Sequence, residues 1–342
     1  MPVPPHKILQ TLFKRFSVST ARLTLLPTLK YALTRPALPQ SGKPALFTMN
    51  ILPPMMTVWH HCVRKYVGDR VDAVIFDCSG GLNPDEFPGA RVQKFLNFYA
   101  ATKSDIFLNQ IARNRRIGWL CDDDIFIINP GAADLVEREL AEPNTASLSF
   151  RPRTWWHFEI NGKTHPPSGS YCIAFNREIF VNREHLSLAP AGGNTHPADG
   201  GRLPARYDTG DKANEILLKK GYRCAIVPEE DGDKYITGFS GMSGTVMLLW
   251  RFKTPEETSD FFLSQPLEKW QGNVLYGTFS ALLAIQCIQE CYARLKGGPY
   301  PLPSLPSKKV LWDIRRSREP HLGGERSFAW IDEAGEKLKN VL

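Results

Sequence analysis

Acidic residues are absent from the first 44 positions of this 342-residue sequence, and the same span carries seven Lys or Arg residues. Those seven account for the whole formal net charge of +7, so the remainder of the chain is electrically neutral. A neutral body argues against a basic groove that follows a nucleic-acid backbone. We therefore predict no nucleic-acid partner.

The cysteines lack any pairing signal. Seven are present, an odd number, and no two of them form a CxxC pair. Reduced thiols in a cytoplasmic compartment are the simplest account of this usage. A secretory signal is not expected either, because no uninterrupted apolar segment follows a charged start.

Long apolar runs are also missing. The most apolar late stretch, 274–288, is interrupted by Thr278, Ser280 and Gln286. It is shorter than the roughly 20 residues that a membrane-spanning helix needs. We predict a helix packed inside the protein, not one that crosses a bilayer.

The acid-free N-terminal arm has an amphipathic pattern. On a helical wheel its apolar residues share one arc, Lys7 and Lys14 point the opposite way, and Arg15 lies near the edge. Such a helix can lie on an anionic membrane, where each basic residue contributes about 1 kcal/mol of attraction. The alternatives are a disordered or domain-packing arm, or an organelle transit peptide. The apolar residues are Ile8, Leu9, Leu12, Phe13 and Phe16.

Beyond the arm, short apolar runs alternate with helical periodicity, which predicts an α/β fold with a mostly parallel sheet flanked by helices. After Gly238 the chain turns mainly helical. We expect an arm at 1–44, an α/β domain at 45–240 and a helical C-terminal extension at 241–342, with a Pro-rich linker near 297–309. The expected strands are 45–52, 71–77, 92–98, 117–121, 145–151, 171–176 and 222–228. The expected helices are 53–66, 104–114, with Ser104 as its N-cap, and 212–220.

Three consecutive aspartates, Asp122, Asp123 and Asp124, follow the strand expected at 117–121. In an extended chain Asp122 and Asp124 point to one side and Asp123 to the other. Two carboxylates on one side can share a hard cation such as Mg²⁺ or Mn²⁺, which offsets their repulsion and can accept phosphate ligands. The carboxyl edge of a parallel sheet is also where α/β proteins bind ligands. The alternative is an acidic surface turn without a metal.

This layout resembles that of nucleotide-sugar glycosyltransferases with the GT-A (Rossmann-like) fold and a DxD motif. The resemblance covers about residues 45 to 240 and rests on the order of elements and on a few short motifs. It implies that Asp122 and Asp124 hold Mn²⁺ or Mg²⁺ on the donor diphosphate. It also implies that Asp77, at the end of the second strand, and Asp123 contact the base or ribose of the donor.

A competing motif is 74-VIFDCSGGL-82, which also looks like the opening motif of haloacid dehalogenase phosphatases. In that family the first Asp is the nucleophile and a second Asp two positions later is the general acid. This chain has Ser79 at the second position, which removes the proton that the leaving group needs. A phosphatase and a non-catalytic, membrane-associated GT-A-like binding protein remain the alternatives.

Acceptor binding is predicted in the segment after the strand at 145–151. Trp155 and Trp156 could stack on the apolar face of a sugar ring, and Arg153 could meet an anionic group. Simple packing is the other interpretation of the tryptophans.

Two carboxylates, Asp208 and Asp211, stand at the start of the helix expected at 212–220 and could cap it. In inverting GT-A enzymes the position that this segment resembles supplies the general base. We therefore predict Asp211 or Asp208 as the catalytic base. The family often adds a histidine ligand to the metal, but 236–245 contains none.

We therefore expect a metal-dependent transferase that moves a sugar from a nucleoside diphosphate to a hydroxyl acceptor, a glycan or a lipid-linked glycan. We slightly favour inversion of configuration at the anomeric carbon over retention, since a candidate base is present. The expected location is the cytoplasm, with the basic arm docked on the membrane surface.

Overall fold

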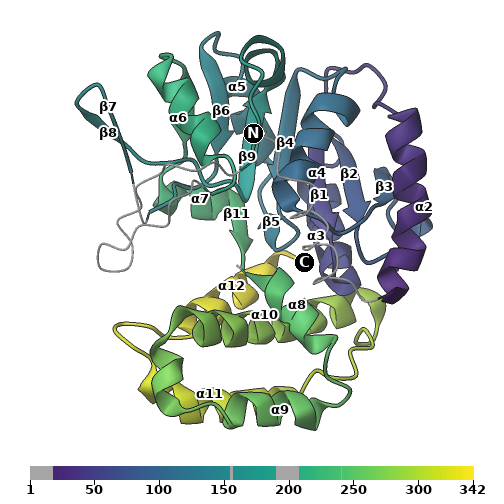
Figure 1. Ribbon diagram of the computed structural model, residues 1–342, viewed down its shortest axis with the longest axis vertical. Coiled ribbons are helices and arrows are strands. Elements are labelled where there is room, and N and C mark those ends of the chain that lie inside the picture. The colour runs from purple at the N-terminus through teal and green to yellow at the C-terminus, as the bar shows by residue number, and fades with distance from the viewer. Residues whose placement is uncertain (1–17, 155–156, 190–207, 240) are drawn as a thin grey trace. The chain divides into compact units, whose positions relative to one another are not determined.

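The computed structural model describes residues 18–154, 157–189, 208–239 and 241–342 (Figure 1). The chain forms two compact units, and it passes between them repeatedly. Unit 1 comprises Met1–Asn50, Arg64–Asp122 and Asn129–Ile236, and unit 2 comprises Ile51–Val63, Asp123–Ile128 and Thr237–Leu342. The amphipathic segment predicted at residues 7–16 lies outside the described residues.

Unit 1 is built on a seven-stranded sheet with the order β10-β6-β9-β4-β1-β2-β3. β9 runs antiparallel to its neighbours β4 and β6, whereas the other paired strands run parallel. The prediction of an α/β architecture with a mixed and mostly parallel sheet is confirmed. The strands are β1 Ala45–Asn50, β2 Asp72–Asp77, β3 Ala90–Lys94, β4 Ile117–Cys121, β6 Thr145–Ser149, β9 Cys172–Asn176 and β10 Arg223–Ile226.

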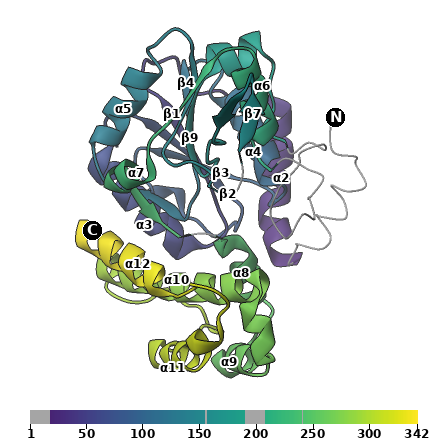
Figure 2. The same cartoon turned by 90° about the vertical axis from the view of Figure 1, so that its left-hand side faces the viewer.

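Helices flank this sheet, which explains why its central strands are buried on both faces. Every residue of β4 and β6 is buried. α5 packs on β6, α6 packs on β10, and α2 packs beside the edge strand β3 (Figures 1 and 2). The helices that lie wholly in unit 1 are α2 Val18–Thr34, α4 Ala100–Ile106, α5 Gly131–Glu139, α6 Asp211–Lys219 and α7 Glu229–Tyr235; shorter turns are η1 Pro84–Glu86, η2 Phe107–Ile111 and η3 Glu178–Arg183.

Several expected element boundaries in unit 1 differ from the observed ones, and two of the differences are instructive. Ser104 is not an N-cap, because α4 begins at Ala100 and Ser104 is buried inside the helix. The third strand, β3, ends at Lys94, and Phe95 leaves the sheet to stack on Phe76 with 4.2 Å between ring centroids. In both places an aromatic packing or burial requirement from elsewhere in the chain overrides the local signal.

A small hairpin also belongs to unit 1. β7 (Phe158–Ile160) and β8 (Lys163–His165) are antiparallel. Asn161 and Gly162, which join them, both have positive φ, at 53° and 71°. A turn of this kind matches the twist of the two strands and favours Asn-Gly.

Unit 2 is mainly helical, as predicted for the C-terminal part of the chain. α10 packs on α8, α12 and η4, and α9 packs on α11. Phe279 of α10 contacts Phe262, Trp270 and Phe328 edge-on, with ring centroids 5.1 to 5.4 Å apart, which forms the aromatic centre of the unit. The helices and turns are α8 Met242–Leu249, α9 Pro255–Leu263, η4 Leu267–Gln271, α10 Asn273–Lys296, α11 Lys308–Arg318, η5 Glu319–His321 and α12 Ala329–Val341; α3 Pro53–Tyr66 spans both units.

α10 is longer than the sequence suggested. Its 24 residues are long and apolar enough to cross a membrane by length and composition. The helix is nevertheless 61% buried over its most apolar window. Core helices of soluble proteins pass the same test, so α10 is weak evidence for a membrane span.

Candidate functional site

The site in unit 1 lies at the carboxyl ends of the parallel strands β1, β2 and β4. Strands that run parallel end at the same edge of the sheet, where α/β proteins bind ligands. β2 ends at Asp77, and Asp122 directly follows β4. The backbone N–H of Asp122 donates a hydrogen bond of 2.7 Å to the carbonyl oxygen of Tyr171. This bond ties the end of β4 to the start of β9 and fixes the position from which the Asp122 side chain projects.

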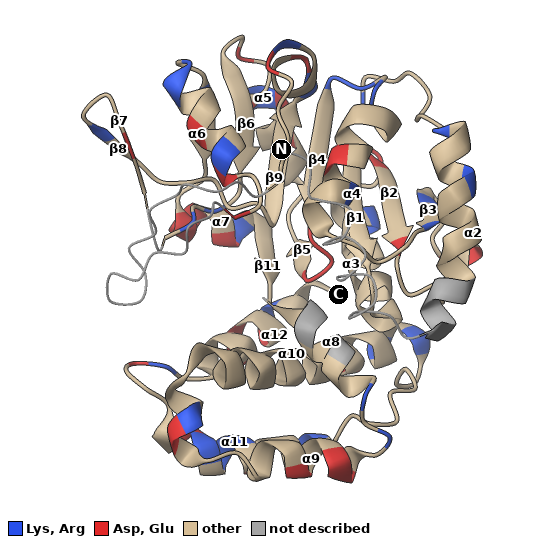
Figure 3. Cartoon of the chain, viewed as in Figure 1, with Lys and Arg blue, Asp and Glu red and all other residues tan. Residues whose placement is uncertain are grey.

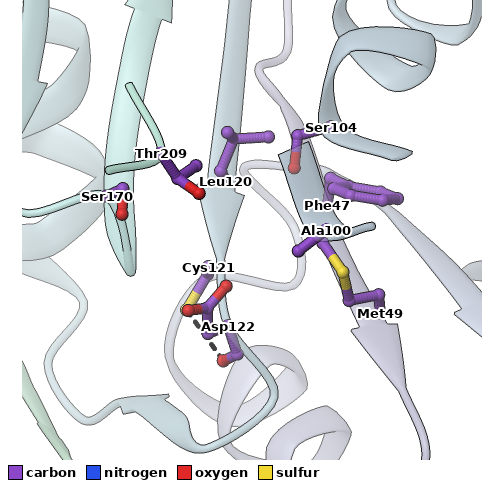
Figure 4. A pocket seen from close by; sticks show the side chains of 9 residues that line it. All are labelled: Phe47, Met49, Ala100, Ser104, Leu120, Cys121, Asp122, Ser170 and Thr209. Carbon is purple, nitrogen blue, oxygen red and sulfur yellow. Dashed lines mark hydrogen bonds between the residues drawn. The ribbon is translucent and has the colours of Figure 1, made fainter. Parts of the chain in front are cut away.

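A cavity of about 70 Å³ opens at this edge, with Asp122 in its wall (Figure 4). Pockets for whole small-molecule ligands are commonly about 300 Å³ or larger. The cavity therefore has room for one part of a ligand, such as a ring or a phosphate. Its lining residues are Phe47, Met49, Ala100, Ser104, Leu120, Cys121, Asp122, Ser170 and Thr209.

The predicted residues Arg153, Asp208 and Asp211 come together beside this cavity. The buried guanidinium of Arg153 donates to Asp208 Oδ2 at 2.8 Å and lies 3.4 Å from Asp211 Oδ1. Its Nη2 donates to Ser170 Oγ at 3.1 Å and to the Thr209 carbonyl at 3.4 Å, and both of these residues line the cavity. One arginine therefore joins both candidate bases to the cavity wall.

The two candidate bases differ in exposure. The side chain of Asp208 is 47% exposed, whereas that of Asp211 is fully buried. Burial raises the pKa of Asp211 to about 6, although the nearby Arg153 charge partly opposes this shift. Asp211 Oδ2 accepts the backbone N–H of Asp208 at 2.9 Å, so Asp211 helps to orient the chain three residues before α6 begins its own first turn at Asp211. Of the two, Asp208 has the carboxylate that an acceptor can reach.

Asp123 and Asp124 belong to unit 2, whereas Asp122 closes a segment of unit 1. Asp123 is buried, and Asp122 and Asp124 are half-buried. Asp123 and Asp124 lie in a turn between β4 and β5, not in the extended chain that the prediction assumed. Desolvation raises the pKa of Asp124 to about 7, and backbone hydrogen bonds only partly offset it. A bound cation would favour the charged carboxylate and reverse this direction.

A two-stranded ladder positions Asp124 within unit 2. β5 (Ile125–Ile127) pairs with β11 (Ile236–Gly238), and the N–H of Phe239 donates to the Asp124 carbonyl at 2.9 Å. Gly238 lies so close that a side chain there would overlap the Asp124 carbonyl oxygen. The glycine is therefore required by the close approach of the two chains.

The donor chemistry of Asp122 and Asp124 fits Mg²⁺ or Mn²⁺, which prefer carboxylate oxygens. Across the described ranges, no group of three or more His, Cys, Asp or Glu side chains is arranged to hold a metal. A cation at these aspartates would therefore need phosphate or water oxygens to complete its coordination. Mg²⁺ commonly binds in this way, through one or two carboxylates plus substrate phosphates.

Asp77 is fully buried, and its hydrogen bonds shape the loop that follows β2. Its Oδ1 accepts the N–H groups of Ser79 and Gly80 and the Ser79 hydroxyl, at 2.6 to 3.0 Å. Its Oδ2 accepts the N–H of Leu82 at 3.0 Å. A carboxylate engaged in this way is a poor nucleophile, which argues against the phosphatase alternative. Its predicted contact with a donor nucleotide stays a prediction.

Sequence reasoning did not identify Lys103 as a residue near the site. This lysine of α4 is buried, and its Nζ lies 3.4 Å from Cys78 Sγ and 3.1 Å from Asn97 Oδ1. A lysine in a helical segment gives no local sign that it will be buried, so only the packing of α4 places its charge beside the loop after β2. Trp155 and Trp156, the predicted acceptor platform, lie outside the described residues.

No model of a known protein family matches the chain, and no curated protein matches it. Solved structures give matches at low identity. Mannosyltransferase PcManGT from Pyrobaculum calidifontis, in complex with GDP-Man and Mn²⁺, is 13% identical over 97% of this chain and 98% of that one, with a TM-score of 0.40. A cytidylyltransferase from Leptospira borgpetersenii is 12% identical over 57% of this chain and 79% of that one, with a TM-score of 0.34. The glycosyltransferase GlyE of Streptococcus pneumoniae TIGR4 is 10% identical over 88% of this chain and 64% of that one, with a TM-score of 0.29. With TM-scores this low, these likenesses carry no argument about activity.

Proposed function

We propose that this protein is a metal-dependent glycosyltransferase that moves a sugar from a nucleoside diphosphate to a hydroxyl acceptor. One observation carries the proposal. At the carboxyl edge of the sheet, Asp122 shares a cavity with Ser170 and Thr209, and Arg153 bonds both of these to Asp208. A group that can hold a cation thus lies near a half-exposed carboxylate that can accept a proton.

In this proposal Asp122 and Asp124 hold Mn²⁺ or Mg²⁺. The chemistry that such an ion supplies is neutralisation of the charge on the departing diphosphate. Asp123 and Asp77 belong to the donor end of the site, where the base and ribose bind. Trp155, Trp156 and Arg153 belong to the acceptor end, and Arg153 acts there mainly by positioning Asp208.

Asp208 is the general base in this scheme. Its carboxylate takes the proton of the acceptor hydroxyl while the hydroxyl oxygen bonds to the anomeric carbon and the bond from that carbon to the diphosphate oxygen breaks. Attack from the face opposite the diphosphate inverts the configuration. Asp208 Oδ1 accepts the N–H of Thr209 at 2.8 Å, and Oδ2 accepts from Arg153, so the carboxylate is held in one orientation. Asp211 supports this orientation, because its Oδ2 accepts the backbone N–H of Asp208.

The first experiment identifies the donor. Purified full-length protein is mixed with UDP-, GDP-, CMP- or dTDP-sugars, with and without Mn²⁺, and its melting temperature is measured. A donor that binds only in the folded state raises this temperature, by mass action. We expect one nucleotide class to raise it, and only when Mn²⁺ is present. No shift with any donor would contradict the proposed site.

The second experiment tests the chemistry with the donor so identified. Asp122→Asn keeps the size of the side chain but removes its charge, and we expect it to reduce metal-dependent release of the nucleotide at least about 100-fold. Asp208→Asn should keep donor binding and lose turnover by about 100-fold or more. Asp260→Asn on the exposed face of α9 is the matched control and should behave as wild type.

The outcomes separate the alternatives. Donor binding without release of the nucleotide in the wild type, with any acceptor, would favour the non-catalytic binding protein. Unchanged turnover of Asp122→Asn, with wild-type stability, would contradict the assignment of the metal site.

A further inference from the structure

α2 has its polar and apolar faces reversed relative to an ordinary surface helix. Between Leu23 and Thr34, where the structure describes its side chains, it buries Thr24, Thr28 and Tyr31. The Thr28 hydroxyl donates to the Thr24 carbonyl at 2.7 Å and accepts the N–H of Leu96 at 2.8 Å. An ordinary surface helix turns its apolar face toward the core and its polar face toward water. The inner face of α2 is anchored by hydroxyl groups and one aromatic ring.

The opposite face of α2 is made of leucine. Leu26, Leu29 and Leu33 are 72%, 52% and 87% exposed, and we call these three the leucine face. Their spacing of three and four residues places them in one row along the helix. Contiguous exposed apolar surface of this kind marks an interaction site. The helix lies beside β3 at one end of the sheet of unit 1 (Figure 1).

The charge near the leucine face indicates which kind of partner binds it. The exposed Lys30 lies within the row, the exposed Arg35 directly follows the helix, and residues 18–44 carry no acidic residue. A second copy of the chain, bound face to face, would bring two copies of these basic residues together and be repelled. Elsewhere on the chain Lys and Arg positions are interspersed with Asp and Glu positions (Figure 3). The occupant that complements both the leucines and the positive charge is an anionic, apolar surface.

We infer that the leucine face docks on an anionic lipid bilayer. The three leucine side chains enter the boundary between headgroups and acyl chains, and Lys30 and the neighbouring basic residues contact the headgroups. This interaction does not depend on the proposed transferase activity. It concerns one face of unit 1 and leaves the cavity at Asp122 untouched.

The test uses full-length protein and sedimentation with vesicles. We expect binding to vesicles of phosphatidylcholine mixed with phosphatidylserine, and at least about tenfold weaker binding to phosphatidylcholine alone or at high salt. Leu26→Gln/Leu29→Gln/Leu33→Gln, in which glutamine keeps the helix propensity of leucine, should weaken binding to the anionic vesicles by about tenfold or more with an unchanged melting temperature. Lys30→Glu should weaken it severalfold.

A matched control tests whether vesicle binding depends on the leucine face itself or on exposed apolar side chains anywhere on the protein. Leu263→Gln/Leu267→Gln/Val274→Gln changes three exposed apolar residues of unit 2, which are 45%, 39% and 85% exposed, and should bind as wild type. Equal vesicle binding by the wild type and the α2 triple variant would overturn the inference. So would a wild-type dimer that the triple variant converts to a monomer, or a triple variant with a lowered melting temperature, because either result means that protein covers the leucines.

Discussion

Asp77 is the residue whose local role the structure specifies most fully. Its two carboxylate oxygens accept four hydrogen bonds from residues 79 to 82, and the side chain is fully buried. Removing the carboxylate leaves three backbone N–H groups of the loop without their acceptors. Buried donors that lose an acceptor are costly because water does not replace it.

We therefore expect Asp77→Ala to lower the free energy of unfolding by about 3 kcal/mol or more, whether or not the protein binds nucleotides. Urea unfolding checks this value. Asp85→Ala, at an exposed position of the same loop, should change the free energy by less than about 0.5 kcal/mol. Equal stability of the two variants would mean that Asp77 does not hold the loop.

The burial of Asp211 predicts how the stability of the protein depends on pH. Burial raises its pKa in the folded protein to about 6, from a value of 3.8 without burial. Between these values the folded protein keeps a proton that the unfolded chain has released. The stability contribution of Asp211 therefore falls as the pH rises from about 4 to about 6, and it is constant above that window.

The measurement is urea unfolding of the wild type and of Asp211→Asn at several pH values. The amide does not titrate, so the free energy of the wild type minus that of the variant should fall by 2 to 3 kcal/mol, as an order of magnitude, over this window. A difference that stays constant, or rises with pH, would show that Asp211 is not desolvated.

At the scale of elements, the pairing of β5 with β11 controls where Asp124 lies. A Cβ atom on Gly238 would overlap the Asp124 carbonyl oxygen and come within 2.9 Å of the Ile125 Cα. Backbone atoms cannot move aside as a flexible side chain can. Gly238→Ala must therefore separate the two strands.

We expect Gly238→Ala to destabilise the protein by about 2 kcal/mol and to abolish the Mn²⁺-dependent rise in melting temperature with a donor. Gly277→Ala is the control, because a Cβ on this glycine of α10 meets nothing within 4 Å. It should raise stability by about 0.5 to 1 kcal/mol, since alanine favours the helix. An unperturbed Gly238→Ala protein would mean that the ladder does not set the position of Asp124.

Element boundaries show where local signals suffice and where they fail. The helix at Pro53–Tyr66 and the strand at Ile117–Cys121 match the predicted ranges, because proline fixes the first turn and a short apolar run fills a buried strand. The hairpin around Asn161 and Gly162 was not predicted, although an Asn-Gly pair between alternating residues is the signal for it. Ser104 gave a false N-cap signal, because the packing of α4 starts that helix four residues earlier.

At the scale of the whole molecule, all seven cysteines are thiols, as expected for reduced cysteines. Five are buried and two, Cys224 and Cys287, are half-buried. Desolvation raises the pKa of both of these to about 11, so little reactive thiolate forms near neutral pH.

A thiol reagent should therefore label the native protein slowly and at no more than two positions, and the denatured protein at seven. Intact-mass measurement counts the labels. Prior treatment with a reductant is the control and should leave the denatured count unchanged. Fewer than seven labels before reduction would reveal a disulfide bond.

The sequence by itself determined the seven strands of the main sheet in their chain order, the acidic end of the fourth strand and the basic character of the N-terminal arm. These are local properties, set by side-chain periodicity along a short stretch of chain and by the residues that end it. The grouping of Arg153 with Asp208 and Asp211 was not visible in this way, because the arginine is 55 residues from the first of them.

Only the tertiary structure decided which side chains are buried. It buries Asp211 and leaves Asp208 half-exposed, it encloses Lys103, and it turns the leucines of α2 outward while covering its threonines. Burial depends on contacts between segments that are distant in sequence, and the two units themselves are each assembled from several such segments. No local pattern encodes those contacts, because a residue's own neighbours in the chain do not determine which other elements will cover it.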